Sequence, residues 1–422
     1  MTKRLFPLTL ALLAAPAFAQ DAAEALRVNA ADGDPLLVLD TDGGLSVTGA
    51  KDVGTVPTTG VGTRMMWAPS RAAFRAGDLN SFGGAYWDLA NLGYSSAAFG
   101  ENTRASGAQA FAAGLTTTAS GAQAVAFGSN STASGDRAVA MMSGTASALD
   151  AFAIGAGSQA TADYAMAFGA SSIAGGLASL TMGPSRADGS FSVAIGLQNL
   201  ASAPFAFALG KNARATHQGS FVISDASAVL SQDSVMSARN NDFTLRATGG
   251  VRIFTSLSTS ADDVADHGPI AGVRLAPGGG SWTSISDRNR KENVEPVDGE
   301  ALLGRLRGVP VTTWNYIAEG PDARHMGPMA QDFHRAFGLN GADSLGINTV
   351  DIDGVALAAA QALDARTAAL QAENAALRAD LDALRAEVRQ HHPLERAAGL
   401  LGGLGLFAAG LGLALVARRR QA

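Results

Sequence analysis

The 422-residue chain contains no cysteine, and only 6% of its residues are aromatic. Without thiols it has no disulfide bonds, thiolate metal sites or cysteine nucleophiles, although their absence leaves the cellular compartment open. Few aromatic side chains beside 50 glycines indicate a thin stack of small side chains rather than a large globular interior. A chain of this length is expected to form two or three units.

The chain also has only a small excess of charge of one sign, because its formal net charge is −6. No cluster of Lys and Arg with interleaved aromatic residues occurs, so electrostatics give no support for a nucleic-acid partner. The Asp40–Gly43 run has Lys51 where a calcium loop needs its bidentate glutamate, and His391–His392 lacks a third ligand nearby. No nucleotide-binding or zinc-protease motif occurs either. We therefore expect no metal and no cofactor.

The N-terminal residues 1–20 have the order of a secretory signal peptide. Lys3 and Arg4 precede an apolar run over 5–15, and Ala17-Phe18-Ala19 stands just before Gln20. We therefore expect the protein to be exported.

At the other end, residues 397–417 are all apolar or glycine, and a basic tail at 418–422 follows. At 1.5 Å per residue this run can cross the ~30 Å hydrocarbon core of a bilayer as a helix. The positive-inside rule places the arginines in the cytoplasm. The pattern predicts one transmembrane helix in the inner membrane, with the bulk of the chain periplasmic or extracellular.

Residues 93–226 repeat with a period of 14 that slips to 13. A triplet such as Val193-Ala194-Ile195 alternates like a strand with one side inward. A glycine follows the strand in most repeats, at positions 100, 114, 128, 155, 169, 183, 196 and 210. Each repeat is expected to be one rung of a β-solenoid with a narrow, alanine-filled interior. One such coil is marginal against ~1–2 kcal/mol of backbone entropy per residue, so trimerisation is expected.

These repeats resemble the head repeats of trimeric autotransporter adhesins (YadA-like), whose motif has the form S-x-A-x-G. The resemblance implies a homotrimeric head in which each chain is a left-handed parallel β-roll. It leaves the ligand of the head open, including a surface or carbohydrate ligand. On either side, 21–92 is expected to form an N-terminal cap and packing segment, and 227–280 to close the head and end in a Gly/Pro linker.

Residues 281–352 differ in composition from the segment before them, because charged residues become frequent from Ser284 to Val294. A serine protease without a usable histidine can employ a lysine base when burial or nearby cations lower the lysine pKa. Arg288 and Arg290 are such cations near Lys291. A serine five residues before a lysine is not by itself evidence of a protease, so the interpretation depends on the surrounding motifs.

Those motifs are SDRNRKENVEPVDG from Ser286, VTTWNY from Val311, HMGPMAQDF from His325 and INTVD from Ile347. Together they resemble the peptidase S74 family, the intramolecular chaperones of phage tailspikes such as endosialidases and the related domain of myelin regulatory factor proteins. The resemblance implies an α+β domain that helps three chains fold and then cuts the bond before its leading serine.

Carried onto this sequence, the resemblance implies cleavage between Ile285 and Ser286, with Ser286 as nucleophile and Lys291 as base. Asp287 and Asn293 match motif positions whose roles are left open. Asn289-Arg290 stands where the family often has an apolar residue before the lysine.

The segment 353–390 follows a heptad pattern that predicts a parallel coiled coil. One seam position holds Leu363, Leu370, Leu377 and Leu384, and the alternate one holds Ala360, Thr367, Asn374, Leu381 and Val388. Asn374 at a seam position is expected to fix the register at a cost in stability.

The assembled hypothesis is a mainly β, exported, trimeric fibre whose S74-like domain cuts itself once. Cleavage would free residues 21–285 from a membrane-anchored stalk of 286–422, so the protein is at most a single-turnover Ser/Lys peptidase. The main alternative is a permanently anchored adhesin with an inactive assembly domain. Such adhesins end in amphipathic strands, but residues 391–422 show no such alternation.

Two other interpretations concern the chain ends. The tail resembles sorting signals of the PEP-CTERM class, although His392-Pro393-Leu394-Glu395 lacks their Pro-Glu-Pro. A phage tail fibre is disfavoured because virion fibres carry no signal peptide.

Overall fold

The computed structural model describes residues 24–227, 233–255, 271–391 and 402–413. The chain divides into two compact units. One comprises Met1–Arg252 with Leu275–Ser281, and the other comprises Ile253–Arg274 with Trp282–Ala422.

The first unit begins with an antiparallel meander and a hairpin. The meander comprises β1 (Glu24–Asn29), β2 (Pro35–Asp40) and β3 (Leu45–Val47). The hairpin comprises β4 (Gly62–Ala68) and β5 (Ala73–Leu79), joined by the 3-10 turn η1 (Pro69–Arg71), and a second 3-10 turn, η2 (Leu89–Asn91), follows. β5 pairs in parallel with β6 (Ala97–Glu101), the first repeat strand. The hairpin therefore covers an edge that the solenoid would otherwise expose.

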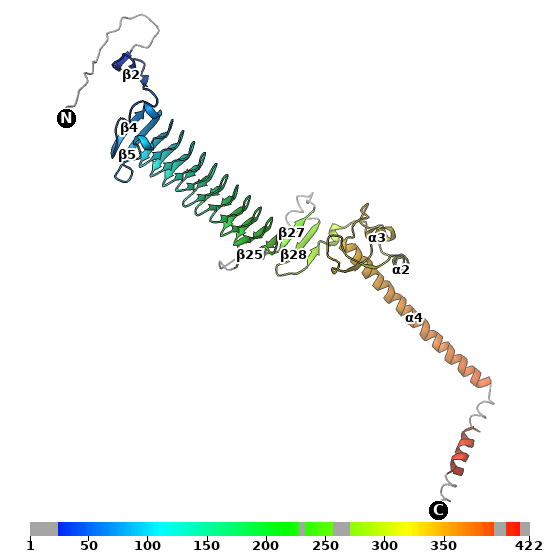
Figure 1. Ribbon diagram of the computed structural model, residues 1–422. Coiled ribbons are helices and arrows are strands. Elements are labelled where there is room, and N and C mark those ends of the chain that lie inside the picture. Colours follow the sequence, from blue (N-terminus) through cyan, green and yellow to red (C-terminus); the bar gives the residue numbers. More distant parts are fainter. Residues whose placement is uncertain (1–23, 228–232, 256–270, 392–401, 414–422) are drawn as a thin grey trace, which may run out of the picture. The chain divides into compact units, whose positions relative to one another are not determined.

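The repeats form a β-solenoid of two parallel sheets, visible as the stack of rungs in Figure 1. After β6, the large sheet continues through β8 (Phe111–Leu115), β10 (Val125–Ser129), β12 (Val139–Met141), β14 (Phe152–Ile154), β16 (Met166–Phe168), β18 (Leu180–Met182), β20 (Val193–Leu197), β22 (Phe207–Lys211), β24 (Phe221–Ser224) and β26 (Phe243–Arg246). The small sheet contains β7 (Arg104–Ala105), β9 (Thr118–Ala119), β11 (Thr132–Ala133), β13 (Thr145–Ala146), β15 (Gln159–Ala160), β17 (Ile173–Ala174), β19 (Arg186–Ala187), β21 (Leu200–Ala201), β23 (Ala213–Ala215) and β25 (Val235–Met236). The predicted mainly β solenoid head is confirmed.

Alanines of successive rungs stack in register and fill the interior of the solenoid. Ala126 pairs with Ala112 on one side and Ala140 on the other, and all three are fully buried. Backbones also meet closely at the turns: a Cβ added to Gly107 would lie 1.8 Å from the carbonyl oxygen of Gly121. Small residues are thus required by the width of the coil, as the composition indicates.

The sheets continue beyond residue 226, where the sequence pattern placed the end of the repeats. Phe221 pairs with Phe243, a wider spacing than the 14-residue period, and β25 pairs with β23. The longer connection between β24 and β26 broke the period, so the last rung was not recognised in the sequence.

A further three-stranded sheet has the order β27 (Val251–Phe254), β28 (Gly272–Leu275) and β29 (Trp282–Ser284). The second unit then contains the 3-10 turn η3 (Arg288–Arg290), the helix α2 (Gly299–Leu306), the hairpin of β30 (Thr312–Trp314) and β31 (His325–Gly327), the helix α3 (Ala330–Phe337) and the long helix α4 (Thr349–His391). Its small core joins Leu302 and Leu303 of α2 to Ala359 of α4.

Helix α4 covers the segment predicted to form a coiled coil. Its first turns pack on α2 through Ala359, and Val355, four residues earlier, is also buried. Farther along, the predicted seam leucines are about half exposed in the single chain, from 47% at Leu381 to 58% at Leu377. The helix is as expected, while its pairing with other copies stays a prediction.

The two predictions at the chain ends fall wholly or partly outside the described residues. The signal peptide at 1–20 lies outside them, and the predicted membrane span at 397–417 is described only over 402–413, which is helical. Within the part of the chain that the structure describes, no helix is both long and apolar enough to cross a membrane.

Candidate active site at Ser286

Ser286 lies just after the last strand of the three-stranded sheet. The strand β29 ends at Ser284, and the amide nitrogen of Ile285 donates a 3.1 Å hydrogen bond to the carbonyl oxygen of Gly272. Gly272 has a φ of +148°, and a Cβ there would come within 2.2 Å of the carbonyl oxygen of Ile253. The residue before the predicted scissile bond is therefore held by backbone pairing.

The short turn η3 reverses the chain between Ser286 and Lys291. Its first residue follows Asp287, whose Oδ1 accepts a 3.0 Å hydrogen bond from the amide nitrogen of Asn289. At the other end, the amide nitrogen of Lys291 donates to the carbonyl oxygen of Arg288 at 3.2 Å. The side chain of Asp287 thus caps the turn, as Asp does at helix N-termini.

The turn brings the two predicted catalytic side chains together. Lys291 Nζ donates a 2.7 Å hydrogen bond to Ser286 Oγ. This contact has the geometry that proton transfer from a nucleophile to its base requires. Downstream, Asn293 has a φ of +54°, a conformation that asparagine tolerates better than most residues, and it redirects the chain after the lysine.

Ser286 and Lys291 are both exposed in the single chain. With Arg288 and Val294 they line an open hollow of about 450 Å³, and the Val294 side chain is 77% exposed. Water can therefore reach the dyad. In the single chain the two side chains are thus in contact but open to solvent, without the dry surroundings that a lysine base needs.

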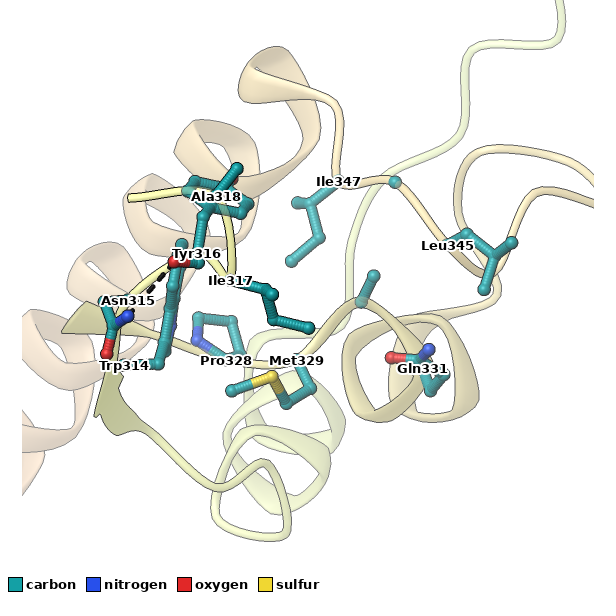
Figure 2. Close-up of a pocket in the computed structure, with 12 residues that line it drawn as sticks. Trp314, Asn315, Tyr316, Ile317, Ala318, Pro328, Met329, Gln331, Leu345 and Ile347 are labelled. Carbon is teal, nitrogen blue, oxygen red and sulfur yellow. Dashed lines mark hydrogen bonds between the residues drawn. The ribbon is translucent and has the colours of Figure 1, made fainter. Parts of the chain in front are cut away.

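A second feature of this unit is an apolar groove that sequence reasoning missed. Its volume is about 770 Å³, and Figure 2 shows Ile317, Met329 and Ile347 facing one space from different segments. Ile317 is fully exposed, and Leu345 is 79% exposed. The available sequence signal was Tyr316-Ile317, two large apolar residues in the loop after the hairpin strand, and both are exposed in the fold.

The hairpin beside the groove carries a packed aromatic group. Trp314 lies 4.9 Å from the ring centroids of both Tyr316 and His325. His325 Nε2 is 2.8 Å from Glu319 Oε2, and this hydrogen bond holds the pKa of Glu319 below its usual value. Trp314 and His325 sit opposite each other in the β30–β31 pair, so these motif residues hold the hairpin together.

Comparison with known families supports both resemblances. Residues 286–341 match the Peptidase_S74 family, described as the chaperone of endosialidase, and the match begins at Ser286 itself. Four segments, 92–115, 119–141, 146–172 and 187–220, match the YadA head domain repeat. A search of curated proteins finds no match. The chain thus carries a region similar to the S74 chaperone behind a head similar to YadA repeats, as the sequence motifs predicted.

Proposed function

We propose that this protein is an exported, trimeric, adhesin-like fibre whose S74-like domain assembles three chains and then cuts each one once between Ile285 and Ser286. The observation that carries the proposal is the 2.7 Å contact of Lys291 Nζ with Ser286 Oγ, directly after a residue held in place by its pairing with Gly272. The family match, which begins at that serine, supports it.

The proposed reaction needs only these two side chains and one water molecule. Ser286 Oγ attacks the carbonyl carbon of Ile285, and its proton passes to neutral Lys291. The C–N bond then breaks as Lys291 returns the proton to the departing amine of Ser286. Water hydrolyses the resulting ester, leaving a carboxylate on Ile285 and a free hydroxyl on Ser286.

The trimer is supported by an apolar face on the outside of the large sheet. Each strand turns its middle residue inward, which is an alanine except for Thr181 in β18 and Val222 in β24, so its first and third residues face outward. In register, one column reads Phe111, Val125, Val139, Phe152, Met166, Leu180, Val193, Phe207 and Phe221, and the other reads Phe99, Ala113, Phe127, Met141, Ile154, Phe168, Met182, Ile195, Leu209 and Ile223. An apolar face of this length, left in water, favours association with copies of the same chain.

The leucine seam of α4 supports the same assembly. Leu370, Leu377 and Leu384 are half exposed on one side of a helix whose buried residues, Val355 and Ala359, lie near its start in the part of the chain that the structure describes. A parallel coiled coil with two further copies would cover these side chains.

Assembly also explains how cleavage could be delayed. The dyad of Ser286 and Lys291 is open to water in the single chain, so neighbouring copies are the natural source of the groups that exclude water from it. Cleavage would then follow trimerisation, and residues 286–422 would act as a removable assembly device.

The apolar run at 397–417 gives the proposal its cellular setting. A membrane-anchored stalk makes the cut a release step that frees the head from the inner membrane. Fractionation of cells that carry a tag after Ala422 tests this part: the tag should remain with membranes, and a soluble tag would remove the anchor from the proposal.

The experiment for the cleavage itself compares wild type with Ser286→Ala. Wild type should give two fragments, and the variant should give one intact chain that still elutes as a trimer in light-scattering chromatography. The exposure of the dyad favours one alternative, a permanently intact adhesin with an inactive assembly domain. If both proteins remain intact trimers, that alternative replaces the protease.

A further inference from the structure

One corner of every rung, just before each strand of the large sheet, requires a left-handed backbone. The φ values there lie between +51° and +61° in nine successive rungs. The residues that occupy this corner are Ser95, Gln109, Gln123, Arg137, Asp150, Tyr164, Ala178, Phe191 and Phe205. Stacked along the solenoid, they form a column that we call the corner ladder.

The corner ladder changes character halfway along the head. In its first half, Gln123 donates a 3.0 Å hydrogen bond to Gln109, and Arg137 pairs with Asp150 at 2.6 Å. These polar side chains are hydrogen-bond or ion-pair partners of one another, as expected at a solvated edge.

The second half of the corner ladder is aromatic except at Ala178. Tyr164, Phe191 and Phe205 are 49%, 51% and 56% exposed. The rings of Phe191 and Phe205 stack with centroids 5.3 Å apart and planes 6° from parallel. Large apolar side chains thus continue along an edge that is polar in the first half.

Aromatic residues are an unfavourable choice for this corner in an isolated chain. Left-handed backbone costs most L-residues about 1–2 kcal/mol, whereas glycine adopts it freely and asparagine more easily. Phe191 and Phe205 add exposed apolar surface to that cost. A partner that covers the rings would offset both terms.

The position of the rings identifies that partner. Phe191 is two residues before Val193 and Phe205 two before Phe207, and both of these belong to the outward apolar column of the large sheet. The aromatic corner therefore extends the face proposed to meet other copies. A second copy of this chain fits a surface continuous with that face better than an unrelated ligand.

Repetition creates a problem that such a corner can solve. Because the rungs are nearly alike, chains shifted by one rung, about 4.8 Å, would still bury alanine-backed apolar sheets against each other. Features that occur in only part of the stack oppose such a shift, and the change from Asp150 to Tyr164 is one.

We propose that Tyr164, Phe191 and Phe205 dock against a second copy of this chain, and that the polar-to-aromatic change of the corner ladder sets the axial register of the three heads. This inference rests on the proposed trimer. It gives the head a means of staying in register after residues 286–422 have been cut away.

Oxidation by hydroxyl radicals, read by mass spectrometry on the unaltered protein, tests the docking. Phe191 and Phe205 should be oxidised at least tenfold more slowly in the native trimer than in the urea-unfolded chain, and Phe82, 67% exposed in the single chain, supplies the exposed reference. If Phe191 and Phe205 react as fast as Phe82 in a chain shown to be trimeric, the docking is wrong although the trimer stands. A monomeric chain would instead overturn the proposed function.

The register is tested with spin labels, since the chain has no cysteine to interfere. Gln159→Cys places one label on the small sheet, on an exposed side chain. Alone it should give one narrow interchain distance. With Phe191→Gln and Phe205→Gln added, the distribution should broaden or split; glutamine already occupies this corner at Gln109 and Gln123.

Two controls keep the register test decisive. Gln109→Phe, in the polar half, should leave the single distance unchanged if register depends on the aromatic half. If the double variant does not fold, Phe205→Gln alone takes its place. An unchanged narrow distance in a folded variant overturns the register role.

Discussion

The carboxylate of Asp287 accepts a 3.0 Å hydrogen bond from the amide nitrogen of Asn289, and the turn that this bond caps carries Lys291 back to Ser286. Asp287 is therefore a positioning residue, which acts on the dyad through the backbone. Loss of such a cap costs about 1 kcal/mol.

Asp287→Ala is therefore expected to slow self-cleavage roughly fivefold, since about 1.4 kcal/mol corresponds to a factor of ten. Asp287→Asn keeps an accepting oxygen and should restore most of the rate. The measurement is the time course of fragment formation after synthesis.

The matched control for this prediction is Asp298→Ala. Asp298 caps α2 in the same way, accepting from the amide nitrogen of Ala301 at 3.0 Å, but it does not line the hollow that contains Ser286 and Lys291. Equal slowing by both alanine variants would mean that caps act only through domain stability.

Lys291→Arg is expected to abolish cleavage. Arginine keeps the positive charge and can reach a nearby hydroxyl, but it does not lose its proton in proteins and so cannot act as a base. Glu292→Gln, a change at the next exposed residue, should leave fragment formation intact. Cleavage of the arginine variant at the wild-type rate would remove Lys291 from the reaction.

Gly107→Ala is expected to disrupt the stacking of rungs. The new Cβ would collide with backbone atoms of Gly121, which cannot swing aside as a side chain can. Gly157→Ala is the control: its φ is +69°, yet nothing lies within 4 Å of the added carbon, so the cost should be about 1–2 kcal/mol. Thermal unfolding followed by circular dichroism should show a clearly larger drop in Tm for Gly107→Ala, and equal drops would contradict the close approach.

Asp225 should make the end of the solenoid sensitive to acid. A hydrogen bond from the Ser227 side chain, and to a lesser extent hydrogen bonds from Thr248, hold the pKa of its carboxyl well below the usual range in the folded state. The stability that it contributes is present above the unfolded pKa of about 4 and is lost as pH falls below it. Asp225→Asn should therefore lower Tm at pH 7 and flatten the fall in Tm between pH 4 and pH 2. A variant with the same acid slope as wild type would rule this carboxyl out as the cause.

Much of the head could be predicted from sequence because its constraint is local and repeated. The buried position of Ala126 and the turn at Gly128 recur in rung after rung, so the period can be recognised in the sequence without knowledge of distant contacts. The last rung was missed because the connection before Phe243 breaks that period, and only pairing with Phe221 reveals it.

The candidate site at Ser286 could be predicted from the sequence only in part. Ser286 and Lys291 were found only through their surrounding motifs, since the pair alone has no signature. The cap of Asp287 on Asn289 and the bond from Ile285 to Gly272 depend on backbone geometry and on chain brought in from β28, which no spacing rule encodes. The groove beside Ile317 likewise arises from three segments that meet only in the folded unit.

The most direct test of the central claim is the intact mass of the purified wild-type chain, with N-terminal sequencing of every fragment. The account predicts two products, one that ends at Ile285 and one that begins at Ser286, and neither in Ser286→Ala. Apart from removal of the signal peptide, a single uncut chain in wild type, or a cut at any other bond, would contradict it.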